Sequence, residues 1–233
     1  MFSKGCFIVF ALTATVNLSL NAPIAIAQQS AQRSTGGQPQ VQVDLFRGLA
    51  DIFSRGMDTL TDTLNRKGYN ARVYSTGGWQ LVARRIASDS AHGQKDLVIL
   101  IGHSLGANAT FDIASELNRQ NIPIELIVTF DATRPQPVPK NVLHLVNFYQ
   151  ENGFGKRVVP GRGFQGELTN HDLTAETGLS HTTIEKSPRL HAMVMQKIAD
   201  VVKKDLGNRL KSSRPKTKKP QTMSGLPPES GHR

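Results

Sequence analysis

An apolar run, Leu97-Val-Ile-Leu-Ile101, leads directly into the sequence Gly-His-Ser-Leu-Gly. Such a run is typical of a strand that is covered on both faces of a parallel sheet. The residues that follow, 105–119, are expected to form a helix, so Ser104 stands on a sharp turn between a strand and a helix. Such a turn needs small residues two positions before and two positions after the serine, and Gly102 and Gly106 meet this need. The turn lifts the Ser104 hydroxyl above the sheet and aims it at the helix N-terminus, where free N–H groups favour negative charge.

The chain between residues 41 and 207 alternates strand-like and helical segments. The expected strands are residues 41–46, 71–74, 97–101, 125–130 and 142–149. The expected helices are one that Ser54 caps and Gly68 ends, residues 79–87, residues 105–119, and one that begins at Ser187-Pro188 and closes near Gly207. This order predicts βαβ units and an α/β fold, with a mainly parallel sheet flanked by helices.

Residues 150–180 interrupt the alternation. They contain five glycines between positions 153 and 166 and few apolar residues. We expect this segment to be a loop or a hairpin excursion over the strand ends.

The N-terminus has the pattern of an export signal. Lys4 precedes a mostly apolar segment, residues 6–20, and Ala25-Ile26-Ala27 is the small-x-small pattern of a cleavage site. Residues 1–27 are therefore predicted to be a signal peptide of a periplasmic or secreted protein. The apolar segment is short and interrupted by polar residues, which disfavours the alternative of an uncleaved membrane anchor.

The signal peptide is followed by three further segments of different composition. Residues 28–40 are rich in Gln, Ser, Gly and Thr and are expected to form a disordered leader. Residues 41–207 form the expected domain. Residues 208–233 are expected to be a disordered basic tail, because they are dominated by Lys, Arg, Ser, Pro and Gly.

The distribution of charge and the cysteine content limit the ligands and reactions that we expect of this chain. The formal net charge is +10, but residues 201–233 carry nine Lys/Arg against two acids and leave residues 28–200 nearly neutral. The tail lacks interleaved aromatic residues, so it is expected to bind an anionic surface rather than a specific nucleic acid.

Cleavage of the signal would remove Cys6, the single cysteine, which excludes disulfides and thiol chemistry in the mature chain. No metal-binding motif is present and no metal is expected.

The residues around Ser104 also carry a family resemblance. Ile101-Gly-His-Ser-Leu-Gly-Ala-Asn108 resembles the nucleophile elbow of the α/β-hydrolase superfamily, in the form common among its lipases and thioesterases. The resemblance implies a compact α/β-hydrolase fold and a serine hydrolase that cleaves an ester or thioester through an acyl-enzyme. It implies a small-molecule or lipid substrate, no cofactor, and a catalytic set in the chain order Ser, acid, His.

The base that the resemblance implies stands on a loop just before the last helix. His181, six residues ahead of Ser187, fits this position, and His171 is its rival. His103 occupies the variable position inside the elbow and is expected to point away from the site.

The acid is expected after a strand that follows the elbow. Asp131 directly ends the strand over residues 125–130, at the sheet edge where active sites of open α/β sheets lie. Glu151, after the next strand, and Asp172, within the glycine-rich segment, are the alternatives.

The resemblance also implies an oxyanion hole, which needs two preorganised N–H donors. One is the backbone N–H of Leu105, the residue after the nucleophile. The other is expected from Gly48 or Leu49, in the loop after the first strand, although this loop departs from the familiar His-Gly type. Two other functions share these features: a non-catalytic binding protein that retains the fold, and an acyltransferase that uses the same three residues.

Overall fold

The computed structural model describes residues 40–49 and 54–212. The expected signal peptide, nearly all of the expected leader and the tail from residue 213 onward lie outside the described residues. Six strands form one sheet, and every neighbouring pair is parallel. The strands are β1 (Val41–Phe46), β2 (Asn70–Tyr74), β3 (Leu97–His103), β4 (Leu126–Phe130), β5 (His144–Tyr149) and β6 (Glu167–Asp172). The helices are α2 (Arg55–Arg66), α3 (Trp79–Ala91), α4 (Leu105–Asn118) and α5 (Pro188–Ser212), with short 3-10 turns η1 (Thr76–Gly78) and η2 (Ile184–Lys186).

The strand order is β2-β1-β3-β4-β5-β6. The chain runs outward from β1 to β2 and then crosses to the other side of β1 to begin β3. The carboxyl ends of β1 and β3, where Phe46 pairs with Gly102, therefore lie at the topological switch point. In open α/β sheets, this crevice is where ligands bind.

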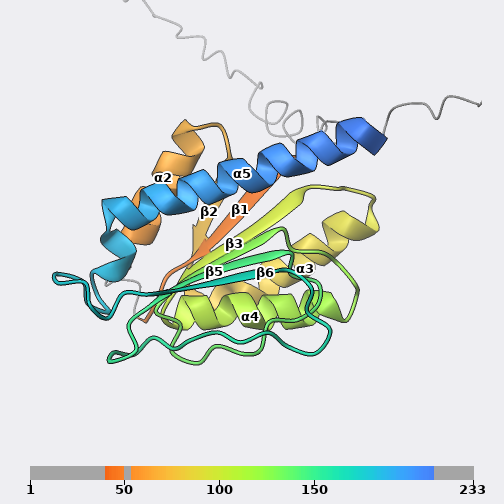
Figure 1. The fold of residues 1–233 in the computed structure, drawn as a ribbon. Helices are drawn as coiled ribbons and strands as arrows, with labels where there is room; N and C mark the ends of the chain where they lie inside the picture. Colours follow the sequence, from red (N-terminus) through yellow and green to blue (C-terminus); the bar gives the residue numbers. More distant parts are fainter. Residues whose placement is uncertain (1–39, 50–53, 213–233) are drawn as a thin grey trace, which may run out of the picture. The chain divides into compact units, whose positions relative to one another are not determined.

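Helices cover both faces of the sheet (Figure 1). On one face, α2 and α5 pack their apolar residues against alternate residues of β1, β3 and β4, and on the other face α3 and α4 do the same. The strand β3 is buried along its whole length, as its uninterrupted apolar sequence predicts. The structure confirms the α/β class with a mainly parallel sheet.

The segment expected to be a loop or hairpin contains the sixth strand. β6 pairs in parallel register with β5 from His144–Glu167 to Tyr149–Asp172. It is an edge strand whose side chains are only partly buried, so its sequence, Glu-Leu-Thr-Asn-His-Asp, carries no apolar run that would reveal it. The expectation of a loop here is wrong for these six residues.

The last helix is longer than its sequence predicts. α5 continues past Gly207 to Ser212, and an i,i+4 ion pair between Asp205 and Arg209 spans the glycine. Its buried residues end at Val201, so the last turns extend beyond the core. Among the described residues, no helix is both long and apolar enough to cross a membrane.

Candidate active site

Ser104 occupies the sharp turn between β3 and α4. Its backbone has φ 55° and ψ −120°, a conformation that L-residues rarely adopt, and strain of this kind costs about 1–3 kcal/mol and gathers at functional sites. A Cβ atom on Gly102 would overlap the backbone of Gly106, and one on Gly106 would overlap the backbone of Phe46 and Arg47. Both glycines are therefore needed for α4 to begin so close to the sheet.

Three side chains that are far apart in the sequence form a hydrogen-bonded chain at this turn. The Nε2 atom of His181 lies 2.9 Å from the Oγ atom of Ser104, and its Nδ1 atom lies 3.1 Å from Oδ2 of Asp131. Because the Asp131 carboxylate can only accept a hydrogen bond, Nδ1 carries the proton in a neutral His181. The Nε2 atom is then free to accept the hydroxyl proton of Ser104. This is the arrangement by which a histidine activates a serine hydroxyl.

Asp131 is fixed from several sides. It is fully buried, and its second carboxylate oxygen accepts the backbone N–H of Gln150 at 3.1 Å. Its backbone has φ 48° and its own N–H donates to the Phe148 carbonyl at 2.8 Å. Gly155 lies so close that a Cβ atom there would overlap the Asp131 carboxylate. The carboxylate therefore has little freedom to turn away from His181.

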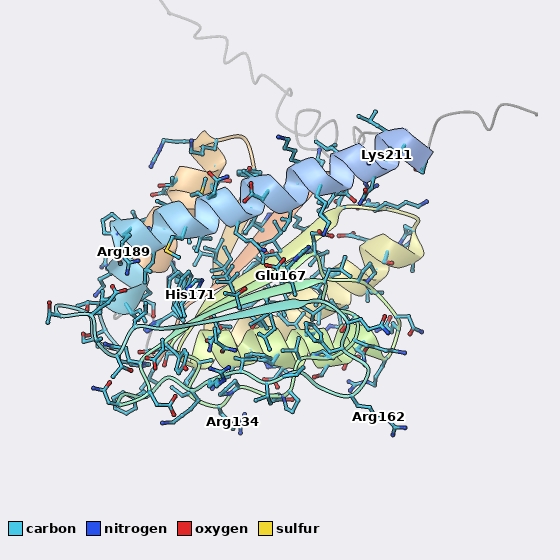
Figure 2. The ribbon with its side chains drawn as sticks, in the orientation of Figure 1. Arg134, Arg162, Glu167, His171, Arg189 and Lys211 are labelled. Carbon is cyan, nitrogen blue, oxygen red and sulfur yellow. The ribbon has the colours of Figure 1, made fainter. Side chains whose placement is uncertain are left out.

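The alternative candidates for the acid and the base are not hydrogen-bonded to Ser104 or His181. Glu151 is exposed, and the Asp172 carboxylate accepts hydrogen bonds from Thr174. The ring of His171 stacks on Phe148 with centroids 5.0 Å apart and lies beneath α5 (Figure 2). The structure thus brings Asp131 and His181 to Ser104, and none of the three alternatives.

His103 does not point away from the site, contrary to the expectation from its place in the elbow. Its Nε2 atom lies 2.7 Å from the backbone carbonyl of His181, and its Nδ1 atom lies 2.8 Å from Oγ of Ser54. The two imidazole rings have centroids 5.0 Å apart. Burial lowers the pKa of His103 to about 4, so its ring is neutral at neutral pH. The elbow position alone could not reveal this, because both partners come from distant segments.

The expected oxyanion donors differ in their availability. The N–H of Gly48 donates to Oγ of Ser54 at 2.8 Å, so it is already engaged, and the expectation that it stabilises an oxyanion is not supported. The N–H groups of Leu49 and Leu105 have no acceptor among the described residues. Leu105 is the first residue of α4, so its N–H also lies at the positive end of the helix dipole.

Exposed apolar side chains lie beside Ser104, His181 and Asp131. Phe154 is 67% exposed, and its ring centroid lies 4.9 Å from that of His181. Leu49 and Leu105, whose backbone N–H groups are the candidate oxyanion donors, also have exposed apolar side chains. Exposed apolar side chains beside reactive groups are suited to contact an apolar part of a substrate. The sequence carries no signal for Phe154, because it stands in the glycine-rich segment without periodicity.

No metal site is present in the part of the chain that the structure describes. Residues 40–49 and 54–212 contain no group of three or more His, Cys, Asp or Glu side chains that could hold a metal ion.

The strand order, the strained serine turn and the Ser–His–Asp hydrogen bonds define a protein of the α/β-hydrolase class. The chain belongs to the Thioesterase domain family, whose model matches residues 43–224. This membership confirms the α/β-hydrolase resemblance and places the chain among hydrolases of esters or thioesters.

Solved structures with low sequence identity are similar to this chain. One is a protein from Xanthomonas campestris pv. campestris described as an alpha/beta-superfamily hydrolase, with 15% identity and a TM-score of 0.41, covering 68% of this chain and 99% of that one. Another is Est1E from Butyrivibrio proteoclasticus, with 12% identity and a TM-score of 0.43, covering 72% of this chain and 90% of that one. A search of curated proteins finds no match.

Proposed function

We propose that this protein is an exported serine hydrolase that cleaves an ester or thioester through an acyl-enzyme on Ser104. The observation that carries the proposal is the pair of hydrogen bonds that His181 makes, to Oγ of Ser104 on one side and to Asp131 on the other. Membership of the Thioesterase domain family supports the substrate class.

In the first half of the reaction, Oγ of Ser104 attacks the substrate carbonyl carbon while its proton passes to Nε2 of His181. Asp131 accepts a hydrogen bond from Nδ1 and stabilises the imidazolium. The N–H groups of Leu105 and Leu49 are the proposed donors to the carbonyl oxygen, which becomes negatively charged. The C–O or C–S bond to the leaving group then breaks, and His181 returns the proton to the departing oxygen or sulfur.

In the second half, water attacks the acyl-enzyme carbonyl and gives one proton to Nε2 of His181. The tetrahedral intermediate collapses, the bond to Oγ breaks, and the proton returns to Ser104. The products are a carboxylic acid and an alcohol or thiol, and the enzyme is regenerated without a cofactor.

An apolar acyl group is the substrate part that the flanking side chains favour. Phe154, Leu49 and Leu105 are exposed beside the reacting groups, and covering them with an acyl chain would remove apolar surface from water, which is favourable by about 25 cal/mol per Å².

The proposed activity is tested by steady-state hydrolysis of p-nitrophenyl esters and acyl thioesters of graded chain length. Ser104→Ala should lose about 10⁴–10⁶-fold in kcat, and the exposed Ser90→Ala on α3 should match the wild type. Turnover that persists in purified Ser104→Ala would overturn the nucleophile assignment. A wild-type protein that folds, turns over no ester or thioester and does not react with a fluorophosphonate would instead be a non-catalytic binding protein.

Export and the basic tail are proposals that rest on the sequence. Residues 1–27 have the pattern of a signal peptide, and residues 208–233, the predicted basic tail, are rich in Lys and Arg. N-terminal sequencing of the protein recovered from outside the cytoplasm should begin at Gln28. Binding of the full-length protein to anionic vesicles should weaken as salt rises, and the chain truncated after Leu210 should bind weakly at low and at physiological salt.

A further inference from the structure

The elbow histidine makes contacts that the proposed reaction does not use. His103 is 2% exposed, and both nitrogens of its ring are engaged: Nε2 with the backbone carbonyl of His181, and Nδ1 with the hydroxyl of Ser54. A buried polar side chain with two well-made hydrogen bonds fixes the segments that supply its partners.

The chemistry of the partners fixes the direction of these bonds. A carbonyl oxygen can only accept, so Nε2 of His103 must carry the ring proton that reaches His181. In a neutral imidazole the other nitrogen is then an acceptor, so the Ser54 hydroxyl donates to Nδ1. The Ser54 oxygen in turn accepts the backbone N–H of Gly48 at 2.8 Å. These three hydrogen bonds, from Gly48 to Ser54, from Ser54 to His103 and from His103 to His181, form a continuous series that we call the His103 relay.

The Ser54 side chain does not cap the helix that it precedes, although its position is the usual one for a capping serine. It stands at the N-cap position of α2, where a serine hydroxyl commonly bonds a free N–H of the first helical turn. Here the side chain makes no capping hydrogen bond. Instead it is fully buried and bonds Gly48 and His103. The position of the hydroxyl is therefore explained by the relay and not by the helix that it precedes.

We propose that His103 is a positioning residue, which ties the loop bearing the base His181 to the loop bearing the oxyanion donor Leu49. Both loops lie beside the Ser104 turn, and His103 is the residue immediately before it. The proposal rests on the function proposed above, since positioning matters only if these groups act together. A displacement of about 1 Å in such groups can lower a rate about 10²-fold.

Substitutions can separate the two ends of the relay. In His103→Gln the amide nitrogen can still donate toward the His181 carbonyl, whereas in His103→Asn the amide oxygen can still accept from Ser54. His103→Phe keeps an aromatic ring, which is somewhat larger than imidazole, and removes both bonds. The control is His144→Gln, a substitution of another buried histidine at the start of β5, the end of the sheet opposite Ser104.

The expected kinetics follow from these differences. His103→Phe should lower kcat about 10²-fold and leave KM for a small ester nearly unchanged, and the Gln and Asn variants should lose less. His144→Gln should lower the melting temperature without lowering kcat. Ser54→Ala and His103→Gln break the same bond, so the double variant should lose no more than the larger single loss. Full additivity of these two would contradict a relay.

A second measurement does not depend on turnover. Long-range 1H–15N NMR spectra of the imidazole nitrogens should show His103 with its proton on Nε2 and His181 with its proton on Nδ1. In His103→Phe the His181 signals should shift and no longer report a single tautomer, and in His144→Gln they should remain as in the wild type. Ser54→Ala, which keeps the histidine, should shift the Nδ1 signal of His103 and serves if His103→Phe does not fold.

The two measurements separate the positioning role from the proposed function. Wild-type kcat in His103→Phe, or unchanged His181 signals in that variant, would overturn the positioning role while leaving the hydrolase intact. If the wild type lacks Ser104-dependent turnover, the proposed function fails, and the NMR comparison alone decides whether His103 holds His181.

Discussion

The Nε2 atom of His181 lies 2.9 Å from the Oγ atom of Ser104, although the two residues are 77 positions apart in the chain. Each comes from a different part of the fold: Ser104 from the turn after the central strand β3, and His181 from the loop that joins the edge strand β6 to α5. Asp131, which is fully buried, joins His181 to the end of β5, because one of its carboxylate oxygens accepts from Nδ1 of His181 and the other from the backbone N–H of Gln150.

The identity of the acid is the first consequence that can be tested. Asp131→Asn removes the carboxylate that accepts from Nδ1 of His181 and should lower kcat about 10⁴-fold, as the loss of the third member of such a set does. Glu151→Gln and Asp172→Asn should stay close to the wild type, since neither side chain bonds His181. Kinetics of the three variants with one small ester measure this directly. A larger loss in Glu151→Gln than in Asp131→Asn would reverse the assignment.

The close approach of Gly155 to Asp131 gives a second prediction. A methyl group at position 155 would overlap the Asp131 carboxylate, so Gly155→Ala should displace the carboxylate from His181 and lower kcat/KM about 10–10²-fold. Gly153→Ala is the matched control, because a Cβ atom there would lie 3.4 Å from the Gln150 carbonyl, an ordinary contact. Equal kcat/KM in the two variants would show that the Asp131 carboxylate tolerates a shift at this point.

The sequence revealed the parts of the site whose signals are local. The apolar strand, the two glycines around Ser104, the carboxylate directly after β4 and the histidine ahead of the last helix can each be found within a few residues. The strand β6 could not be found, because an edge strand needs no apolar run. The roles of His103, Ser54 and Gly48 could not be found either, because each hydrogen bond joins segments that only the tertiary fold brings together.

The exposed ring of Phe154 beside His181 gives a prediction about substrate length. If the ring contacts the acyl chain, Phe154→Ala should raise KM for long-chain esters about 3- to 10-fold, since burying a large apolar side chain is worth about 1.5–3 kcal/mol when complete, and should change KM for an acetyl ester little. Leu143→Ala is the control, as Leu143 is also exposed but precedes β5 at the other end of the sheet. A KM increase that does not depend on chain length would argue against an acyl contact.

The buried carboxyl of Glu185 gives a prediction about stability and pH. Burial raises the pKa of Glu185 to about 7 from the ordinary value of 4.5, although Lys186 and the backbone N–H groups at the start of α2 oppose the shift. Between these two values the folded protein holds a proton that the unfolded chain has released. The free energy of unfolding therefore falls as the pH rises from about 4.5 to about 7.

Glu185→Gln removes this titration, so the change in Tm between pH 5 and pH 8 should be more positive in the variant than in the wild type. His103 acts in the opposite sense, because burial lowers its pKa to about 4 and stability rises with pH between about 4 and 6.5, but this contribution is present in both proteins and cancels. The exposed Glu151→Gln serves as the control. Thermal unfolding followed by circular dichroism measures the difference, and parallel Tm curves for Glu185→Gln and the wild type would contradict it.

If acyl transfer passes through Ser104, an acyl group bound to its Oγ atom can be trapped during turnover. Wild-type protein is mixed with a p-nitrophenyl ester, quenched in acid within the first turnover and digested, and the peptides are analysed by mass spectrometry. We expect an added acyl mass on the peptide that contains Ser104, localised to that residue by fragmentation, and no such mass in Ser104→Ala. An acyl group found on another residue, or sustained turnover with no acylated peptide at the same quench times, would contradict acyl transfer through Ser104.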